Sequence, residues 1–120
     1  MSASRARLEG PVPGDPFVVA AGVASAAGYV REEWFLSGTA SGYSLRGERG
    51  EDGRWDAERA AHAPFATRIV VLRPQDPARF DGTTVVEWMN VSGGIDAAPD
   101  CLFLHRHLMR EGSVWVGVSA

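Results

Sequence analysis

The stretch that decides the fold is Thr83-Thr84-Val85-Val86-Glu87-Trp88-Met89-Asn90-Val91-Ser92-Gly93-Gly94. Its first seven residues are rich in β-branched and aromatic side chains with little polar interruption, which predicts a strand buried on both faces. The polar, glycine-containing segment 90–94 follows directly, which predicts a tight loop at the end of that strand.

A helix and another strand are expected after this loop. Asp96 is a suitable N-cap, Pro99 suits the first turn, and Gly112 supplies the C-terminal stop. At 100° per residue one side of the helix is apolar and carries Cys101, Leu102, Leu104, Leu108 and Met109. The apolar run at residues 113–119, Ser-Val-Trp-Val-Gly-Val-Ser, predicts another strand. Strand, helix and strand form a βαβ unit, so 83–89 and 113–119 should be parallel.

The first half of the chain is less regular. Residues 29–40 and 66–73 predict strands, the second stopped by Pro74, and we expect both to be antiparallel additions at one edge of the sheet. Residues 41–65 are rich in glycine and charge without periodicity, which predicts a loop. The Ala-rich stretch before Tyr29, residues 17–28, fits either a helix or an extended arm. The sequence therefore predicts one partial α/β domain over residues 1–120, with a lead-in over 1–28 and the sheet, loop and first helix over 29–120.

Composition limits the classes of partner. The chain has 120 residues, a formal charge of -3, 45% hydrophobic residues and one cysteine. It is too apolar for a disordered chain, and it lacks the basic stripe of a nucleic-acid-binding protein. No apolar run approaches the ~18 residues of a membrane span. Residues 17–26 resemble a signal peptide's apolar core and cleavage site, but the Gly- and Pro-rich segment 10–16 separates them from the basic Arg5 and Arg7. We therefore expect a cytoplasmic protein without nucleic-acid or membrane partners.

The loop 90–94 is the candidate site. Ligands of open α/β sheets bind beyond the carboxyl ends of the parallel strands. The two glycines allow consecutive N–H groups to point at one anion, either a phosphate or the oxyanion of an acyl-transfer intermediate. A turn in which glycine only relieves steric crowding fits equally well. A nucleotide phosphate fits less well, because the loop lacks the third glycine of a dinucleotide fingerprint and any Gly-Lys-Ser/Thr.

Several segments resemble the bacterial alpha/beta hydrolase domain-containing family. They are Val85–Gly94, Asp96–Asp100, Leu104–Arg106 and Trp115–Ala120, with Tyr29–Ala40 and Asp76–Phe80 upstream. The resemblance implies the N-terminal part of an α/β-hydrolase sheet, with the loop supplying the oxyanion hole. The candidate backbone donors are Val91, Ser92 and Gly93, and Asn90 takes the place of the histidine in the His-Gly-Gly-Gly loop of related enzymes. This chain departs from that loop by lacking both the histidine and the triple glycine.

The same resemblance implies a serine-type ester hydrolase acting on a small-molecule ester. In chain order the nucleophile, acid and base follow this module, so we expect them beyond Ala120 and expect residues 1–120 alone to be inactive. Gly117-Val118-Ser119-Ala120 begins like G-x-S-x-G, but the elbow serine belongs to the next strand, so Ser119 is not expected to be the nucleophile. The alternative is a small non-catalytic α/β protein that binds an anion or other ligand with the same loop.

Other reactive residues have plainer explanations. The three histidines and Cys101 show no metal-ligand spacing, and we expect no metal and no cofactor. His105 falls within the apolar arc as a hydrogen-bonded packing residue, and Cys101 is expected to be an inert core thiol. Glu87 needs a partner in its buried strand, such as Arg68. The free edge of strand 83–89 could support self-association.

Overall fold

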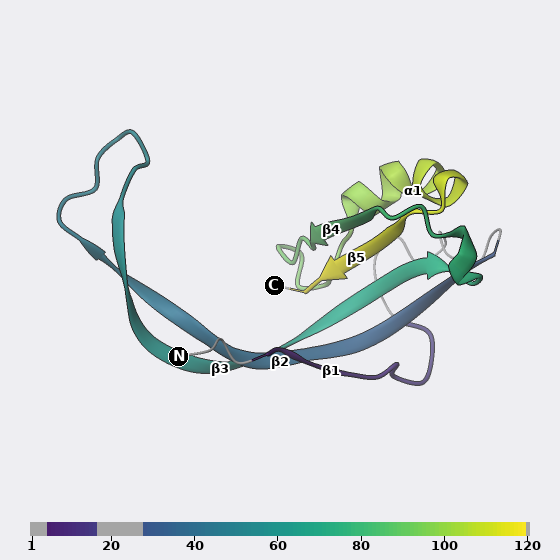
Figure 1. The fold of residues 1–120 in the computed structure, drawn as a ribbon, viewed down its shortest axis with the longest axis horizontal. Helices are drawn as coiled ribbons and strands as arrows, with labels where there is room; N and C mark the ends of the chain where they lie inside the picture. Colours follow the sequence, from purple (N-terminus) through teal and green to yellow (C-terminus); the bar gives the residue numbers. More distant parts are fainter. Residues whose placement is uncertain (1–4, 17–27, 120) are drawn as a thin grey trace.

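The computed structural model describes residues 5–16 and 28–119, in which five strands form one sheet (Figure 1). The strands are β1 (Arg7–Glu9), β2 (Tyr29–Arg46), β3 (Asp56–Pro74), β4 (Thr84–Trp88) and β5 (Val114–Val118). A 3-10 turn, η2 (Pro77–Arg79), precedes β4, and the helix α1 (Pro99–Glu111) joins β4 to β5. The sheet order is β1-β2-β3-β5-β4. The helix or extended arm was predicted over residues 17–28, of which 17–27 lie outside the described residues.

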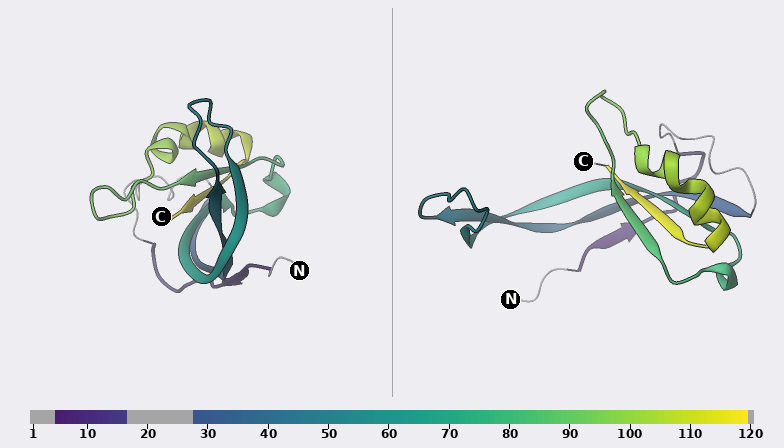
Figure 2. Two further views of the ribbon diagram at one scale, coloured as in Figure 1. Left: turned by 90° about the vertical axis from the view of Figure 1, so that its left-hand side faces the viewer. Right: turned by 90° about the horizontal axis from the view of Figure 1, so that it is seen from above.

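The predicted βαβ unit is confirmed. β4 and β5 are parallel, with Thr84 opposite Val114 and Trp88 opposite Val118. β3 joins the other side of β5 in antiparallel register, and β2 and β1 continue outward from it, also antiparallel. The result is the expected mixed α/β sheet, with α1 lying across one face of its parallel end (Figure 2).

The helix begins and ends near the predicted residues but is capped and covered differently. Pro99 is its first residue, and Gly112 ends it with a left-handed φ of 87° and an N–H bond to the Leu108 carbonyl. Asp96 is not the N-cap, which is Ala98 without a side-chain hydrogen bond. Leu102 and Leu104 were predicted to pack, but they are 48% and 42% exposed. In the described residues the sheet therefore covers a narrower stripe of α1 than the apolar arc suggested.

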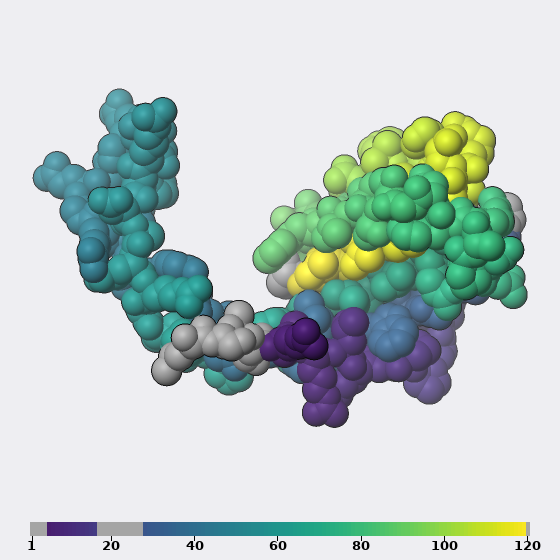
Figure 3. Space-filling view, viewed as in Figure 1, coloured from purple at the N-terminus to yellow at the C-terminus, as the bar shows by residue number. Residues whose placement is uncertain are grey.

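The prediction of a loop over 41–65 is wrong, because β2 and β3 continue as a long hairpin. Their pairing extends to Arg46 opposite Asp56, with an irregularity between Ser41 and Tyr43, and leaves only residues 47–55 as the connection. The distal hairpin projects from the rest of the molecule (Figures 1 and 3), and the extents including the hairpin are 53 × 32 × 31 Å. Backbone pairing sustains this ribbon while nearly all its side chains are exposed, so the sequence carries no alternating apolar pattern there.

The core lies between α1 and the sheet. Its buried members come from both halves of the chain and are Tyr29, Val70, Leu72, Met89, Ala98, Cys101, Leu108 and Trp115. The Tyr29 hydroxyl donates to the carbonyls of Leu108 (3.1 Å) and Ser113 (3.0 Å), so β2 holds the end of the helix and the start of β5. Burial raises the pKa of that phenol.

The opposite face of β4 is open. Val86 and Trp88 are 66% and 75% exposed, whereas Glu87 and Met89 point toward the helix and are buried. The prediction that this strand is buried on both faces is therefore wrong for the described residues, since only the α1 side is covered.

Candidate active site

A cavity of about 730 Å³ opens where the chain leaves β4 and β5. Its lining residues are Asp15, Glu33, Arg68, Val91, Gly94, Ile95, Asp96 and Ser119. Ser119 directly follows β5, and residues 91–96 belong to the loop between β4 and α1. The cavity therefore lies at the carboxyl ends of the two parallel strands, where α/β sheets bind ligands.

The loop closes on itself at its base. The Asn90 N–H donates to the Ala97 carbonyl (2.8 Å), and the Ala97 N–H donates back to the Asn90 carbonyl (2.9 Å). The Asn90 side-chain oxygen accepts from the Ser92 N–H (2.9 Å), which forms an Asx turn. The Gly94 N–H then donates to the Val91 carbonyl (3.0 Å). These four bonds define the shape of the loop within residues 90–97.

The three predicted donors differ in whether their N–H groups are already bonded and whether the residues line the cavity. The Ser92 N–H is already used by Asn90. Gly93 does not line the cavity, and a Cβ added there would meet no atom within 4 Å. Val91 lines the cavity, and its N–H donates to no acceptor among residues 5–16 and 28–119. Val91 is therefore the predicted donor whose position fits the cavity best.

A network of charged and polar side chains forms the wall beside the loop. The Arg68 guanidinium contacts Glu33 on β2 through Nε and Asp96 in the loop through Nη1. The other Asp96 oxygen accepts from the Ser119 hydroxyl (2.8 Å). We refer to Glu33, Arg68, Asp96 and Ser119 as the Arg68 network. Its charged side chains are only 11–19% exposed, so its contacts are shielded from water.

Glu87 does not pair with Arg68, and that expectation is wrong. One carboxylate oxygen of Glu87 accepts from the Asp100 N–H (3.0 Å). The other accepts from the Cys101 N–H and the Trp115 indole N–H, both at 2.9 Å. A buried carboxylate thus occupies the positive end of α1 and satisfies amides that have no partner within the helix. These two amides are not available to an exogenous anion.

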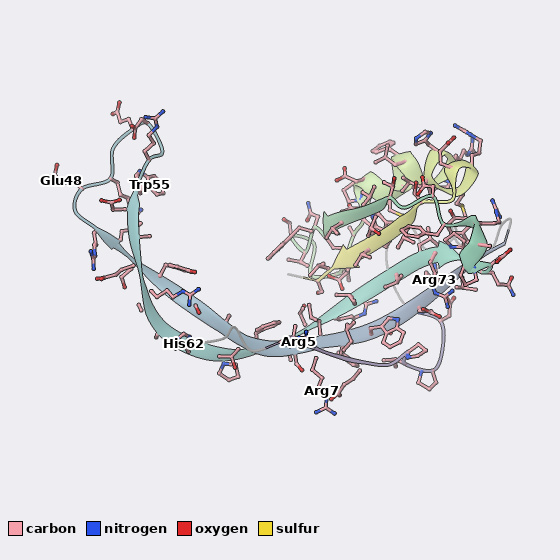
Figure 4. The ribbon with its side chains drawn as sticks, in the orientation of Figure 1. Arg5, Arg7, Glu48, Trp55, His62 and Arg73 are labelled. Atoms are coloured by element: carbon pink, nitrogen blue, oxygen red, sulfur yellow. The ribbon has the colours of Figure 1, made fainter. Side chains whose placement is uncertain are left out.

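The remaining reactive groups lie away from a catalytic arrangement. Burial, and then the charge of Glu87, raises the pKa of the Cys101 thiol to about 12, as expected for an inert core cysteine. His105 Nδ1 lies 2.8 Å from the Leu102 carbonyl within its own helix. A serine–histidine contact joins Ser41 Oγ to His62 Nδ1 (3.2 Å), but it lies on the projecting hairpin (Figure 4).

Comparison with known proteins concerns the family of the whole domain. A family model described as "Alpha/beta hydrolase domain" matches residues 4–120. The chain belongs to this alpha/beta hydrolase domain family. No curated protein and no solved structure gives a match.

Two further findings concern the described part of this alpha/beta hydrolase domain. No helix in it is long and apolar enough to span a membrane. Nor do three or more of its His, Cys, Asp and Glu side chains gather in a group that could hold a metal ion.

Sequence reasoning missed the role of Arg68 and Asp96 in the hydrolase domain. Arg68 precedes the apolar run Ile69–Leu72, and a charge beside a buried strand does signal that a partner is needed. The partners are 35 residues earlier and 28 residues later in the chain. Only the sheet pairing brings the three together.

Proposed function

We propose that this domain forms the oxyanion side of the active site of a serine-type ester hydrolase, with the Val91 N–H as a donor. The proposal rests on one observation: Val91 lines the cavity at the carboxyl ends of β4 and β5, while its N–H has no acceptor in the described part of the chain. Membership of the hydrolase family supports the reaction class.

The chemistry follows from the position of the donor. When a serine attacks an ester carbonyl, negative charge develops on the carbonyl oxygen, and a fixed N–H stabilises it most in the transition state. The loop is held by its own hydrogen bonds, so little reorganisation is needed when that charge appears. The serine, its histidine base and the orienting acid follow the oxyanion loop in the chain order of this fold. The substrate is a small-molecule ester.

Replacing Val91 in the complete protein that carries this domain tests the proposal. Val91→Pro removes the N–H, and Val91→Ala keeps it while shortening the side chain. Asn90 is paired in an antiparallel bridge with Ala97, and extended backbone is what a residue before proline requires. We expect Val91→Pro to lower kcat on p-nitrophenyl esters by about 10²–10³-fold with little change in KM, and Val91→Ala to stay near wild type.

Affinity for a phosphonate transition-state analogue should fall in parallel with kcat. Thermal melts of both variants show whether the fold persists. A folded Val91→Pro variant with wild-type kcat would show that this amide is not an oxyanion donor. The alternative, a non-catalytic protein that binds an anion or other ligand with the same loop, predicts that the complete protein binds the analogue without hydrolysing esters. Glu87 already occupies the first amides of α1, so such a ligand would depend on the loop amides alone.

A further inference from the structure

The Arg68 network joins four separate parts of the fold at the cavity wall. Glu33 lies on β2, Arg68 on β3, and Asp96 in the loop between β4 and α1. Ser119, after β5, donates its hydroxyl hydrogen to Asp96 (2.8 Å). The Ser119 N–H also donates to the Arg68 carbonyl (2.9 Å), so Arg68, Asp96 and Ser119 form a closed ring of contacts.

We propose that Arg68 and Asp96 are positioning residues that set the loop, and with it the Val91 amide, at the depth that catalysis requires. This inference rests on the proposed function of the loop. Asp96 is adjacent to Ala97, which pairs with Asn90 at the base of the loop. A displacement of Asp96 is therefore passed through one backbone bridge to the residue next to Val91.

Arginine is suited to this role for a geometric reason. Its planar guanidinium can bond two carboxylates in different directions at once, whereas a lysine ammonium offers a single centre of charge. Here Nε and Nη1 contact different carboxylates, so Glu33 on the rigid sheet fixes the guanidinium and the guanidinium fixes Asp96. The side chains are at most 19% exposed, which keeps the contacts from being screened as surface pairs are.

The network also assigns a role to Ser119. Its hydroxyl contacts Asp96, its N–H and carbonyl are bonded to Arg68 and Thr67, and no histidine is among its hydrogen-bond partners within the described residues. Through these hydrogen bonds Ser119 holds the loop against the end of β5.

Four variants of the complete protein test the proposal: Asp96→Asn, Arg68→Lys, Ser119→Ala and, as the matched control, Arg46→Gln. Arg46 also pairs with a glutamate, Glu58, but on the exposed hairpin. We expect Asp96→Asn and Arg68→Lys to lower kcat by about 10- to 100-fold with KM changed less than about threefold, as for a misplaced catalytic group. Ser119→Ala should lower kcat by less than about tenfold, whereas loss of a nucleophile lowers kcat by about 10⁶-fold. Arg46→Gln should leave kcat unchanged.

The analogue affinity and the Val91 variants separate the possible outcomes. A purely structural role would lower the melting temperature of Asp96→Asn while leaving kcat and phosphonate affinity of the folded enzyme intact, and that result overturns the proposal. If Val91→Pro lowers kcat and Asp96→Asn does not, the positioning role fails and the oxyanion loop stands. If Asp96→Asn lowers kcat and a folded Val91→Pro does not, Asp96 acts otherwise than through this amide, and both proposals fail.

Discussion

At the scale of single residues, the two adjacent glycines of the loop differ in what they allow. Gly94 has a left-handed φ of 77°, whereas Gly93 is not in that region and has open space around its missing Cβ. An alanine at Gly94 must adopt a conformation that costs roughly 1 kcal/mol or more. The sequence placed the oxyanion candidates at Val91, Ser92 and Gly93, but Gly94 is the position where the loop needs glycine.

We therefore predict that Gly94→Ala lowers both stability and kcat of the complete protein. Gly53→Ala is the matched control, because Gly53 has φ 73° and open surroundings but lies at the tip of the hairpin. It should cost a similar ~1 kcal/mol of unfolding free energy and leave kcat unchanged. Gly93→Ala should affect neither strongly. Equal kcat in the Gly94 and Gly53 variants would mean that the bend at Gly94 has no part in catalysis.

At the scale of elements, the pairing of β2 with β3 carries a charge pair whose effect depends on pH. Glu32 accepts from Arg73 Nη2 (2.6 Å) and Nε (3.1 Å) across the two strands. The hydrogen bond from Arg73, more than its charge, lowers the pKa of Glu32 below its ordinary 4.5, against the opposing effect of burial. A lowered folded-state pKa stabilises the fold above the unfolded pKa, and this contribution is lost as pH falls through the folded value.

The expected result is that the free energy of unfolding decreases as pH falls from about 5 to about 3, and decreases less steeply in Glu32→Gln. Urea titrations at several pH values measure this. Arg73→Gln removes the same pair, so it should flatten the profile similarly, and the double variant should add little. An unchanged pH profile in Glu32→Gln would show that this pair does not contribute to acid sensitivity.

At the scale of the whole molecule, β4 is an edge strand of the described sheet with an apolar outer face. Only β5 pairs with it, and Val86 and Trp88 are largely exposed. An apolar edge with unpaired backbone groups is a template for pairing with another chain. We therefore propose that residues 1–120, prepared alone, self-associate through this edge.

Sedimentation of the 120-residue chain at micromolar concentration checks this prediction. We expect concentration-dependent dimers or larger species, reduced by Trp88→Lys or Val86→Lys, because charge on an edge opposes strand addition. Phe103→Lys is the control, since Phe103 is 81% exposed but belongs to α1 and not to β4. A cooperative monomer at all concentrations would count against association through β4.

The sequence by itself determined the parts of this protein that depend on neighbouring residues. The run of β-branched and aromatic residues at 83–89, the proline and glycine at the ends of α1, and the apolar run at 113–119 each impose local geometry, so the βαβ unit could be predicted directly. The hydrolase family was indicated separately, by the resemblance of several segments to its members. The same local patterns did not predict the strands within residues 41–65. An exposed hairpin is held by backbone pairing, which requires no alternating pattern of apolar side chains.

Only the tertiary structure decided which distant groups meet. The carboxylate of Glu87 caps α1 and accepts a hydrogen bond from the Trp115 indole, 28 residues away. Asp96 is therefore not needed as the predicted N-cap, and it contacts Arg68 and Ser119 instead. A charged residue in an apolar run indicates that a partner is needed, but several acidic and basic residues could be that partner. The free energy of each possible pairing depends on burial and geometry that exist only in the folded chain. The same holds for the oxyanion candidates. Which loop amides keep an acceptor depends on hydrogen bonds that exist only in the folded loop between β4 and α1.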